Sequence, residues 1–273
     1  MAAATIDLDT FLAHVRGVAA LLPPGRHAVN LCEDRYRFMV ARIGARHRAP
    51  PQRLAIQRVD GRVLPMAQIA LTIEADVAGL EVDPRVSRAI RGQVAVATTP
   101  GQVRRVRLIP SDPPACGAAL DAIAAADLVV LGPGSWFTSV IPHMLVPELF
   151  DALAATRARK AVVLNLAAQP GETAGFSAER HLHVLAQHAP GFGVDDVIVD
   201  SGSVPEGRER EHLQRAARSL GAAVRYADVA QEGTHKHQPS KLAAVLEQLA
   251  STRVATDRQP GGEHRGRDTS VPV

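Results

Sequence analysis

Aromatic residues, cysteines and long apolar runs are all scarce in this chain of 273 residues. Aromatic side chains make up only 3% of the sequence, so the core has to be built from Val, Leu, Ile and Ala. The two cysteines, Cys32 and Cys116, lie far apart without the spacing of a zinc site, which favours two reduced thiols. No apolar run approaches the roughly 20 residues of a membrane span, and the first residues lack a signal-peptide pattern. These absences predict a cytoplasmic protein with no membrane span.

Charge of one sign is not in large excess either, because 31 basic and 28 acidic residues give a net charge of +3. Residues 1–58 carry nine Arg and four acidic residues, whereas residues 59–250 carry 18 basic and 21 acidic groups. The basic character therefore belongs to the first segment, and the body of the chain is mildly acidic. This distribution predicts no nucleic-acid partner.

Residues 127–249 alternate between short apolar runs and amphipathic helical patterns. Such runs are typical of strands buried on both faces of a parallel sheet. The predicted strands are 127–131, 160–168, 196–200 and 222–227, and the predicted helices are 138–156 (limited by Pro142 and Pro147), 177–188, 206–220 and 240–249. Four such units in succession predict an α/β fold, a Rossmann-like three-layer domain with a mostly parallel sheet. Ligands of these sheets bind outside the carboxyl ends of the strands.

The chain before residue 127 gives weaker patterns. Residues 63–77 predict one or two half-buried strands, 94–98 and 104–108 predict two more, and 118–125 predict a helix. Glu74 and Asp76 are two residues apart, which places both carboxylates on one side of a strand. They suit a metal site, an acid–base pair or a solvated strand face, and we expect the last.

The most informative local feature is the loop Gly132–Ser139, where a buried strand turns into a helix. Gly132 and Gly134 let a ligand approach the backbone closely, and the hydroxyls of Ser135, Thr138 and Ser139 suit a phosphate. The alternative is a tight turn whose serines cap the helix, and the spacing alone does not separate the two.

A second loop of this kind, Gln169–Thr173, follows the next strand. Both loops lie on the same edge of a parallel sheet, so Gln169 and Thr173 can converge on the same ligand. Asn165, within that strand, either contacts the ligand or ties the strand to the loop.

The histidines give no metal pattern. His181 and His183 point in different directions on a helix, and together with His188 they are expected to be polar surface residues. His235 and His237 lie in a loop near the end of the last strand, where ligand contact is an alternative to a plain loop role.

The segment from Asp127 to Pro147, DLVVLGPGSWFTSVIPHMLVP, resembles the signature of the gluconeogenesis factors (YvcK-like proteins). They are a branch of the 2-phospho-L-lactate transferase (CofD-like) superfamily. Further matches, in order and spacing, cover roughly residues 59–249: Gly61–Pro65, Arg104–Val106, Gln169–Thr173 and Lys241–Ala243.

The resemblance implies a phosphorylated small-molecule ligand, which is a UDP-sugar in the gluconeogenesis-factor branch, and a role in carbon metabolism and cell shape. The ligand-binding residues expected on this basis are Gly132, Gly134, Ser135, Thr138, Ser139, Asn165, Gln169, Thr173 and His237. The transferase branch instead moves a phospholactyl group to a deazaflavin precursor with a divalent metal such as Mg²⁺. Members of the family form oligomers, so a homo-oligomer is an expected state.

This sequence departs from the family pattern at its start. It lacks a Gly-Gly-Gly-Thr-Gly type loop and an Asp-Asp-Gly-Gly-Ser-Ser-Gly type segment, and it has Lys236-His237-Gln238 where relatives have Arg-His-Asp. Residues 25–38 instead resemble the amino-terminal region of AMP-forming acyl-CoA synthetases. The expected organisation is a foreign basic segment and junction at 1–58, an amino-terminally truncated family domain at 59–250, and a disordered tail at 251–273.

Three functions remain open from the sequence. The first is a regulatory protein that binds a UDP-sugar, weakened by the missing glycine loop. The second is a transferase whose metal is held by Glu74, Asp76 and Asp200. The third is a non-binding interaction module whose basic first segment contacts an anionic surface. Without the family's first strand the sheet edge is open, and we expect the replacement segment to cover it, a second copy to pair with it, or the chain to aggregate.

Overall fold

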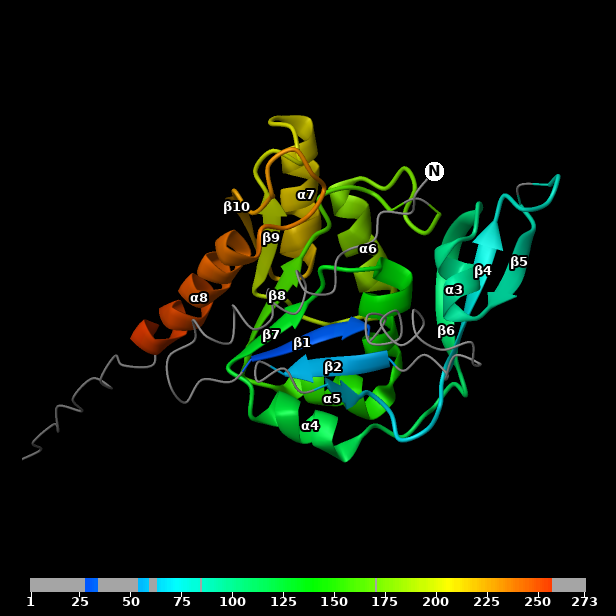
Figure 1. Cartoon of the computed structure of the whole chain (residues 1–273), viewed down its shortest axis with the longest axis horizontal. Helices are drawn as coiled ribbons and strands as arrows, with labels where there is room; N and C mark the ends of the chain where they lie inside the picture. The colour runs from blue at the N-terminus through cyan, green and yellow to red at the C-terminus, as the bar shows by residue number, and fades with distance from the viewer. Residues whose placement is uncertain (1–27, 34–53, 59–62, 84, 170, 257–273) are drawn as a thin grey trace, which may run out of the picture.

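The computed structural model of the chain describes residues 28–33, 54–58, 63–83, 85–169 and 171–256 (Figure 1). A seven-stranded sheet has the order β10-β9-β8-β7-β1-β2-β3, and a separate three-stranded sheet has the order β5-β4-β6. Most of the predicted junction and the part of the predicted tail that follows residue 256 lie outside the described residues. Among those residues, none of the helices is both long and apolar enough to span a bilayer.

One half of the large sheet consists of four parallel strands that run in chain order from β7, in the middle of the sheet, to β10 at its edge. They are β7 (Leu128–Leu131), β8 (Arg159–Val163), β9 (Asp196–Asp200) and β10 (Ala223–Ala227). All four residues of β7 are buried, two on each face of the sheet. Burying each Val or Leu in this way stabilises the fold by about 1.5–3 kcal/mol. The predicted parallel sheet is confirmed.

Helices cover both faces of this sheet. On one face lie α4 (Gly117–Ala124), α5 (Pro147–Ala155), α6 (Ala178–His188) and α7 (Arg208–Ser219). On the other face α8 (Pro239–Thr256) packs Leu242, Leu246 and Leu249 against Leu128, Val130 and Ile198 (Figure 1). The three-layer architecture expected from the sequence is therefore present. Helix α8 continues past Leu249, where the predicted helix ended.

The open edge beside β7 is occupied by β1 (Ala28–Glu33), which comes from the basic first segment. β1 pairs with β7 in parallel, with Ala28 opposite Leu128 and Leu31 opposite Leu131. β2 (Leu54–Arg58) and β3 (Val63–Pro65) continue the sheet in antiparallel fashion. Of the three outcomes expected for this edge, the structure shows the one in which the replacement segment covers it.

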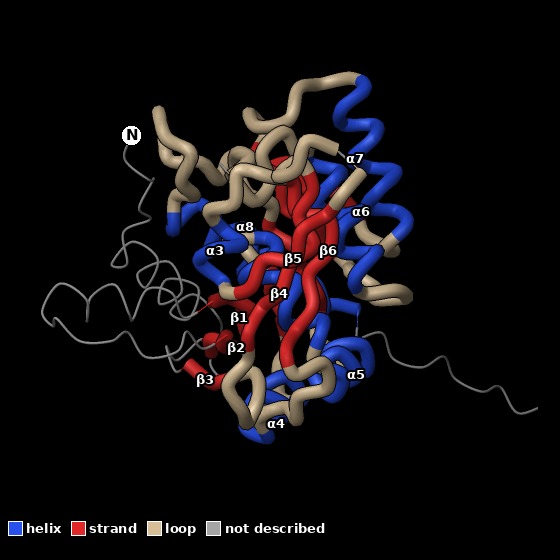
Figure 2. The backbone as a smooth tube through the Cα atoms, turned by 90° about the vertical axis from the view of Figure 1, so that its right-hand side faces the viewer, coloured by secondary structure: helices blue, strands red, loops and turns tan. Residues whose placement is uncertain are grey.

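The small sheet consists of β4 (Thr72–Ala78), β5 (Ser87–Arg91) and β6 (Gln102–Ile109), all antiparallel. Figure 2, turned by 90°, shows it in front of the large sheet. The strand predicted at 94–98 is wrong, because this segment forms helix α3 (Gln93–Ala97). Gly92 (φ +96°) redirects the chain after β5, and Gln93 and Val96 point inward while Val94 stays exposed. Burial at helical spacing thus outweighs the β-propensity of the valines.

Two other boundaries differ from the prediction. The predicted helix at 138–156 is three pieces: η1 (Trp136–Val140), η2 (Ile141–Leu145) and α5, with Pro142 and Pro147 near the starts of the last two. The predicted strand at 160–168 ends at Val163, because Asn165 turns to bond with the loop after β7.

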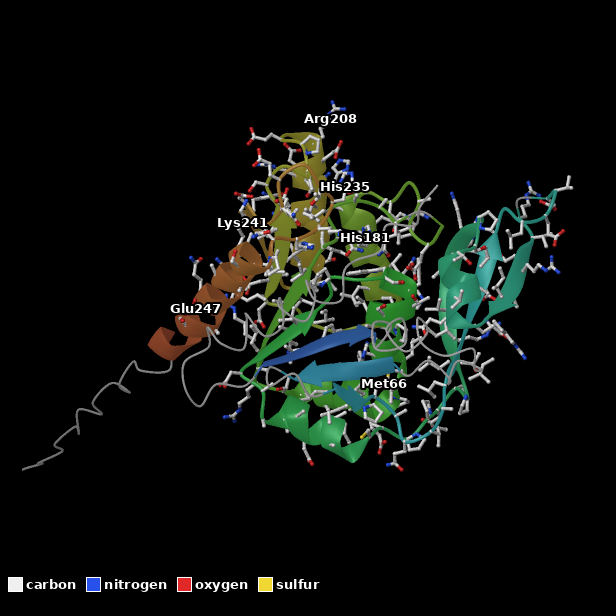
Figure 3. The ribbon with its side chains drawn as sticks, viewed as in Figure 1. Met66, His181, Arg208, His235, Lys241 and Glu247 are labelled. Atoms are coloured by element: carbon white, nitrogen blue, oxygen red, sulfur yellow. The ribbon has the colours of Figure 1, made fainter. Side chains whose placement is uncertain are left out.

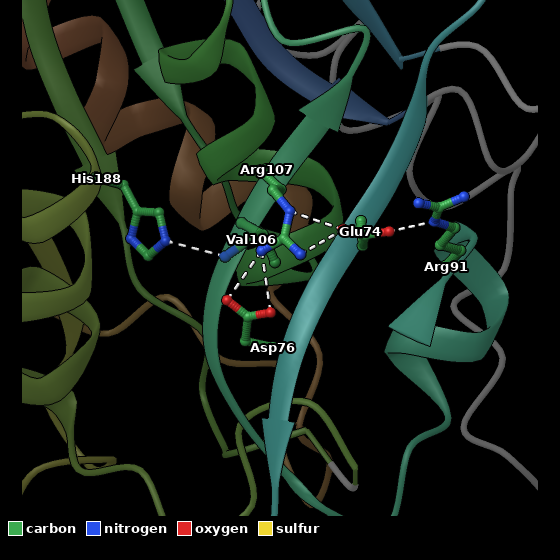
Figure 4. A network of polar contacts seen from close by, with 6 residues as sticks. All are labelled: Glu74, Asp76, Arg91, Val106, Arg107 and His188. Carbon is green, nitrogen blue, oxygen red and sulfur yellow. Dashed lines mark hydrogen bonds and ion pairs between the residues drawn. The ribbon is translucent and has the colours of Figure 1, made fainter. Parts of the chain in front are cut away.

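Glu74 and Asp76 do share one side of β4, as predicted, but they form an ion-pair network instead of a solvated face (Figure 4). Glu74 is 5% exposed and lies between Arg91 and Arg107, with Arg107 Nε 2.7 Å from Glu74 Oε1. Arg107 Nη1 also lies 2.9 Å from Asp76 Oδ2. The hydrogen bonds from Arg91 and then Arg107 hold the pKa of Glu74 below its ordinary value.

His188 joins the small sheet to the helical layer (Figure 4). Its Nε2 accepts a hydrogen bond from the backbone N–H of Val106 at 3.2 Å, and its Nδ1 lies 2.8 Å from the carbonyl oxygen of Val184. Burial lowers the pKa of His188, so the ring is neutral and can accept this bond. His188 was predicted to be a surface residue, but its ring is partly buried and bonded on both sides.

Candidate functional site

The conformation of the loop after β7 depends on Gly132. Gly132 has φ +78°, and a Cβ there would lie 2.8 Å from the carbonyl oxygen of Val163. Only glycine fits such a close approach at a positive φ. The backbone of β8 therefore sets the path on which the loop leaves β7.

Asn165 fixes the next part of this loop. Its Oδ1 accepts a hydrogen bond from the Gly134 N–H at 3.0 Å, and its Nδ2 donates to the Gly134 carbonyl oxygen at 2.8 Å. Of the two roles left open for Asn165, the structure shows the tie between strand and loop. The Gly134 amide is consequently already engaged and is not a free donor.

The hydroxyls of the loop form a buried polar cluster with a carboxylate from the second loop. Ser135 Oγ bonds both to Thr138 Oγ1 and to Glu172 Oε2. Ser135 is 8% exposed, Thr138 is fully buried and Glu172 is 2% exposed. The two loops thus converge as predicted, but through Glu172, a residue that was not among the expected site residues. A carboxylate in a loop at the carboxyl end of a buried strand was the sequence signal for it.

Helix α3, which lies between β5 and β6 in the chain, supports both loops. Gln93 Nε2 donates to the carbonyl oxygen of Thr138 at 2.9 Å. Gly171 has φ +88°, and a Cβ there would lie 2.9 Å from the carbonyl oxygen of Ala97 and 3.0 Å from that of Thr99. No sequence pattern indicated this support, because residues 94–98 were predicted to form a strand.

The second loop closes on itself. The Gln169 N–H donates to Thr173 Oγ1 at 2.9 Å, and the Thr173 N–H donates to the Gln169 carbonyl oxygen at 3.1 Å. Thr173 is fully buried, so its hydroxyl shapes the loop. Gln169 Oε1 is buried and has no hydrogen-bond partner among the described residues.

His237 approaches the same sheet edge from the loop before α8. The ring bonds to the backbone of Leu164, just after β8, and lies near Asp200 at the end of β9. Burial lowers the pKa of His237 to about 4, although Asp200 and the Leu164 bond act against this shift. The ring is therefore neutral at pH 7, and its buried Nε2 has no partner among the described residues.

The remaining histidines differ in position. His181 (Figure 3) is wrong as a surface residue, because it is 4% exposed and its ring stands edge-on to Trp136 at 5.2 Å and to Phe176 at 5.4 Å. His183 is exposed while His181 faces the core, because residues two apart on a helix point in different directions. His235, labelled in the β10–α8 loop in Figure 3, is exposed. Ser139 is buried, with its N–H bonded to the carbonyl oxygen of Ser135.

The carboxylates expected to hold a metal do not fit that role. Glu74 and Asp76 are paired with arginines on the small sheet. Asp200 accepts three backbone hydrogen bonds, from the N–H groups of Gly202, Val229 and Ala230, at 2.9–3.1 Å. In the part of the chain that the structure describes, no group of three or more His, Cys, Asp or Glu side chains is placed to hold a metal ion.

The chain is similar to known proteins both in sequence and in structure. The family model described as 2-phospho-L-lactate transferase CofD matches residues 44–238. A gluconeogenesis factor homologue of Mycobacterium tuberculosis is 64% identical over 220 residues, which covers 77% of this chain and 64% of the relative. A homologue from Mycobacterium leprae is 70% identical over 189 residues, covering 69% of this chain and 53% of the relative. The chain thus spans about half to two thirds of the length of these relatives.

The fold is also similar to that of a solved structure. A UPF0052 family protein from Bacillus halodurans superposes with a TM-score of 0.57 at 27% identity, covering 68% of this chain and 61% of that chain.

Proposed function

This chain belongs to the 2-phospho-L-lactate transferase CofD family, and from that premise we propose that it binds a UDP-sugar at the carboxyl ends of β7 and β8. In this proposal it acts as a regulatory protein of the gluconeogenesis-factor branch, linked to carbon metabolism and cell shape. Ligand binding, and not turnover, is the activity to measure first.

The observation that carries the proposal is the position of the loop after β7. The chain order of the large sheet reverses between β1 and β7, since β2 and β3 lie on one side and β8 to β10 on the other. Open α/β sheets bind ligands at the carboxyl ends of strands next to such a reversal. The loop Gly132–Ser139 begins there, and the Gln169–Thr173 loop meets it through the Ser135–Glu172 bond.

Two buried polar atoms at this edge support a ligand with hydrogen-bonding groups of its own. Gln169 Oε1 is an acceptor without a partner among the described residues. His237 donates to the Leu164 backbone, so its other ring nitrogen, Nε2, is left as a second acceptor. Sugar hydroxyls and the uracil N–H are donors that would satisfy both. Buried polar groups left unpaired are costly, which favours a ligand at this edge.

Ser135 and Thr138 are the phosphate-binding residues in this proposal. Isothermal titration with UDP-glucose should show binding to the full chain, and Ser135→Ala combined with Thr138→Ala should weaken it at least tenfold. Thr98→Ala combined with Ser219→Ala is the control, because it removes two hydroxyls elsewhere in the chain, each of which bonds to a backbone carbonyl oxygen and not to the other loop.

Micromolar binding that survives the Ser135/Thr138 double substitution would show that the assigned site is wrong. Metal-dependent turnover of a deazaflavin acceptor would assign the transferase activity instead. We also expect the affinity to be lower than that of a relative with the glycine-rich start, because backbone amides in such a loop are strong phosphate donors.

A further inference from the structure

Glu172 lies where an anionic ligand would have to bind. Its Oε2 accepts a hydrogen bond from Ser135 Oγ, which is also bonded to Thr138 Oγ1. These are the two hydroxyls assigned to ligand phosphate above. A hydroxyl has one proton to donate, so Ser135 cannot donate to Glu172 and to a phosphate oxygen at the same time.

The position of Glu172 is fixed by the surrounding fold. Gly171, immediately before it, is seated against the carbonyl oxygens of Ala97 and Thr99 with no room for a side chain. Thr173, immediately after it, is tied to Gln169 by two hydrogen bonds. The carboxylate is therefore held in a defined place, and it is 2% exposed.

The partners of the carboxylate are held equally firmly. Gln93 bonds to the Thr138 carbonyl oxygen, and the Asn165 side chain bonds to both backbone groups of Gly134, next to Ser135. A phosphate that enters therefore meets a preformed pair of hydroxyls already bonded to a carboxylate. Two anionic groups that share the same donors repel each other, and burial strengthens the repulsion.

We propose that Glu172 is a specificity-determining residue of this site, because its carboxylate competes with the phosphoryl group of a ligand for the Ser135 and Thr138 hydroxyls. The inference rests on the proposed function for the location of the phosphate. It deepens that function by stating which residue sets the affinity for the anionic part of the ligand. The competition lowers the contribution of the phosphoryl group to the affinity but does not abolish it.

The test uses the full chain and inorganic pyrophosphate, titrated by calorimetry in the presence of a chelator so that no divalent cation takes part. Glu172→Gln keeps the size and one oxygen acceptor but removes the charge. We expect pyrophosphate to bind this variant at least tenfold more tightly than the wild type. Glu179→Gln, in the first turn of α6, is the matched control for loss of one negative charge and should leave the affinity within about twofold.

Equal or weaker pyrophosphate binding by a folded Glu172→Gln, or no binding by either protein, would overturn the inference. Weaker binding would mean that Glu172 supports the ligand instead of competing with it. Should Glu172→Gln fail to fold, as judged by circular dichroism, Glu172→Ala is measured in its place with the same expectation.

A parallel titration with UDP-glucose separates this inference from the proposed function. If wild type binds UDP-glucose while Glu172→Gln gains nothing for pyrophosphate, the proposed function stands and the role of Glu172 is refuted. If Glu172→Gln gains affinity for pyrophosphate while no protein binds UDP-glucose, the role of Glu172 stands and the nucleotide-sugar function fails.

Discussion

Asn165→Ala tests how the site is held together. The substitution removes both hydrogen bonds to Gly134, at 3.0 and 2.8 Å, without touching the strand that precedes it. Asn165 and Gly134 are both half-buried, so water can replace part of what is lost. Each neutral hydrogen bond is worth roughly 1 kcal/mol net, which gives a loss of about 2 kcal/mol in the free energy of unfolding.

Thermal unfolding measures this loss directly. A loss of 1 kcal/mol lowers Tm by roughly 2–4 °C in a domain of 150–250 residues, so Asn165→Ala should lower it by about 4–8 °C. The affinity for UDP-glucose should fall as well, because the Gly134 peptide sets the position of Ser135. Gln68→Ala removes one bond, from Nε2 to the Ala115 carbonyl oxygen at 3.0 Å, on an exposed side chain, and should cost less than about 1 kcal/mol.

Asn165→Asp separates the two bonds to Gly134. It keeps an oxygen acceptor for the Gly134 N–H but has no donor for the Gly134 carbonyl oxygen, so we expect it to be no more stable than Asn165→Ala. A Tm for Asn165→Ala within 1 °C of wild type, together with unchanged ligand affinity, would refute the reasoning that this side chain fixes the loop.

Two further predictions concern the ends of the sheet. Asp196 is fully buried between Arg159 and Arg225, at 2.6 and 2.5 Å, so Asp196→Ala should cost about 3 kcal/mol in chemical unfolding by leaving two arginines unpaired. Asp228→Ala, which breaks an exposed pair, should cost no more than about 1 kcal/mol, and equal losses would contradict the burial argument. The last prediction concerns the pH dependence of stability through His237. The pKa of His237 is about 4 in the folded chain and 6.5 for an ordinary histidine, so between about pH 4 and pH 6.5 the ring is protonated in the unfolded chain only. The contribution of His237 to the free energy of unfolding is therefore complete above about pH 6.5. It declines as the pH falls to about 4, by up to about 1.4 kcal/mol per pH unit. When unfolding is measured as a function of pH, His237→Gln should lose less stability over this range than wild type.

The sequence by itself determined the layer architecture and the position of the glycine- and serine-containing loop after β7. The continuous apolar run at Leu128–Leu131 predicts a strand buried on both faces, and the glycines and serines after it predict a loop at its carboxyl end. Both follow from local sequence, because periodicity and turn residues reflect short-range geometry. The same reasoning placed Glu74 and Asp76 on one side of a strand, but it gave no indication of their arginine partners on β5 and β6.

Only the tertiary structure decided which side chains form hydrogen bonds with the loop after β7. Glu172 meets Ser135 across 37 positions of the sequence, and Gln93 meets Thr138 across 45. Val94–Thr98 has the composition of a strand, yet its first four residues lie in helix α3, because Gly92 turns the chain and buries Gln93 and Val96. His181 looks polar in the sequence and is buried against Trp136. Contacts between residues far apart in the chain decide these outcomes, since burial and hydrogen-bond partners depend on which elements pack together and not on local pattern.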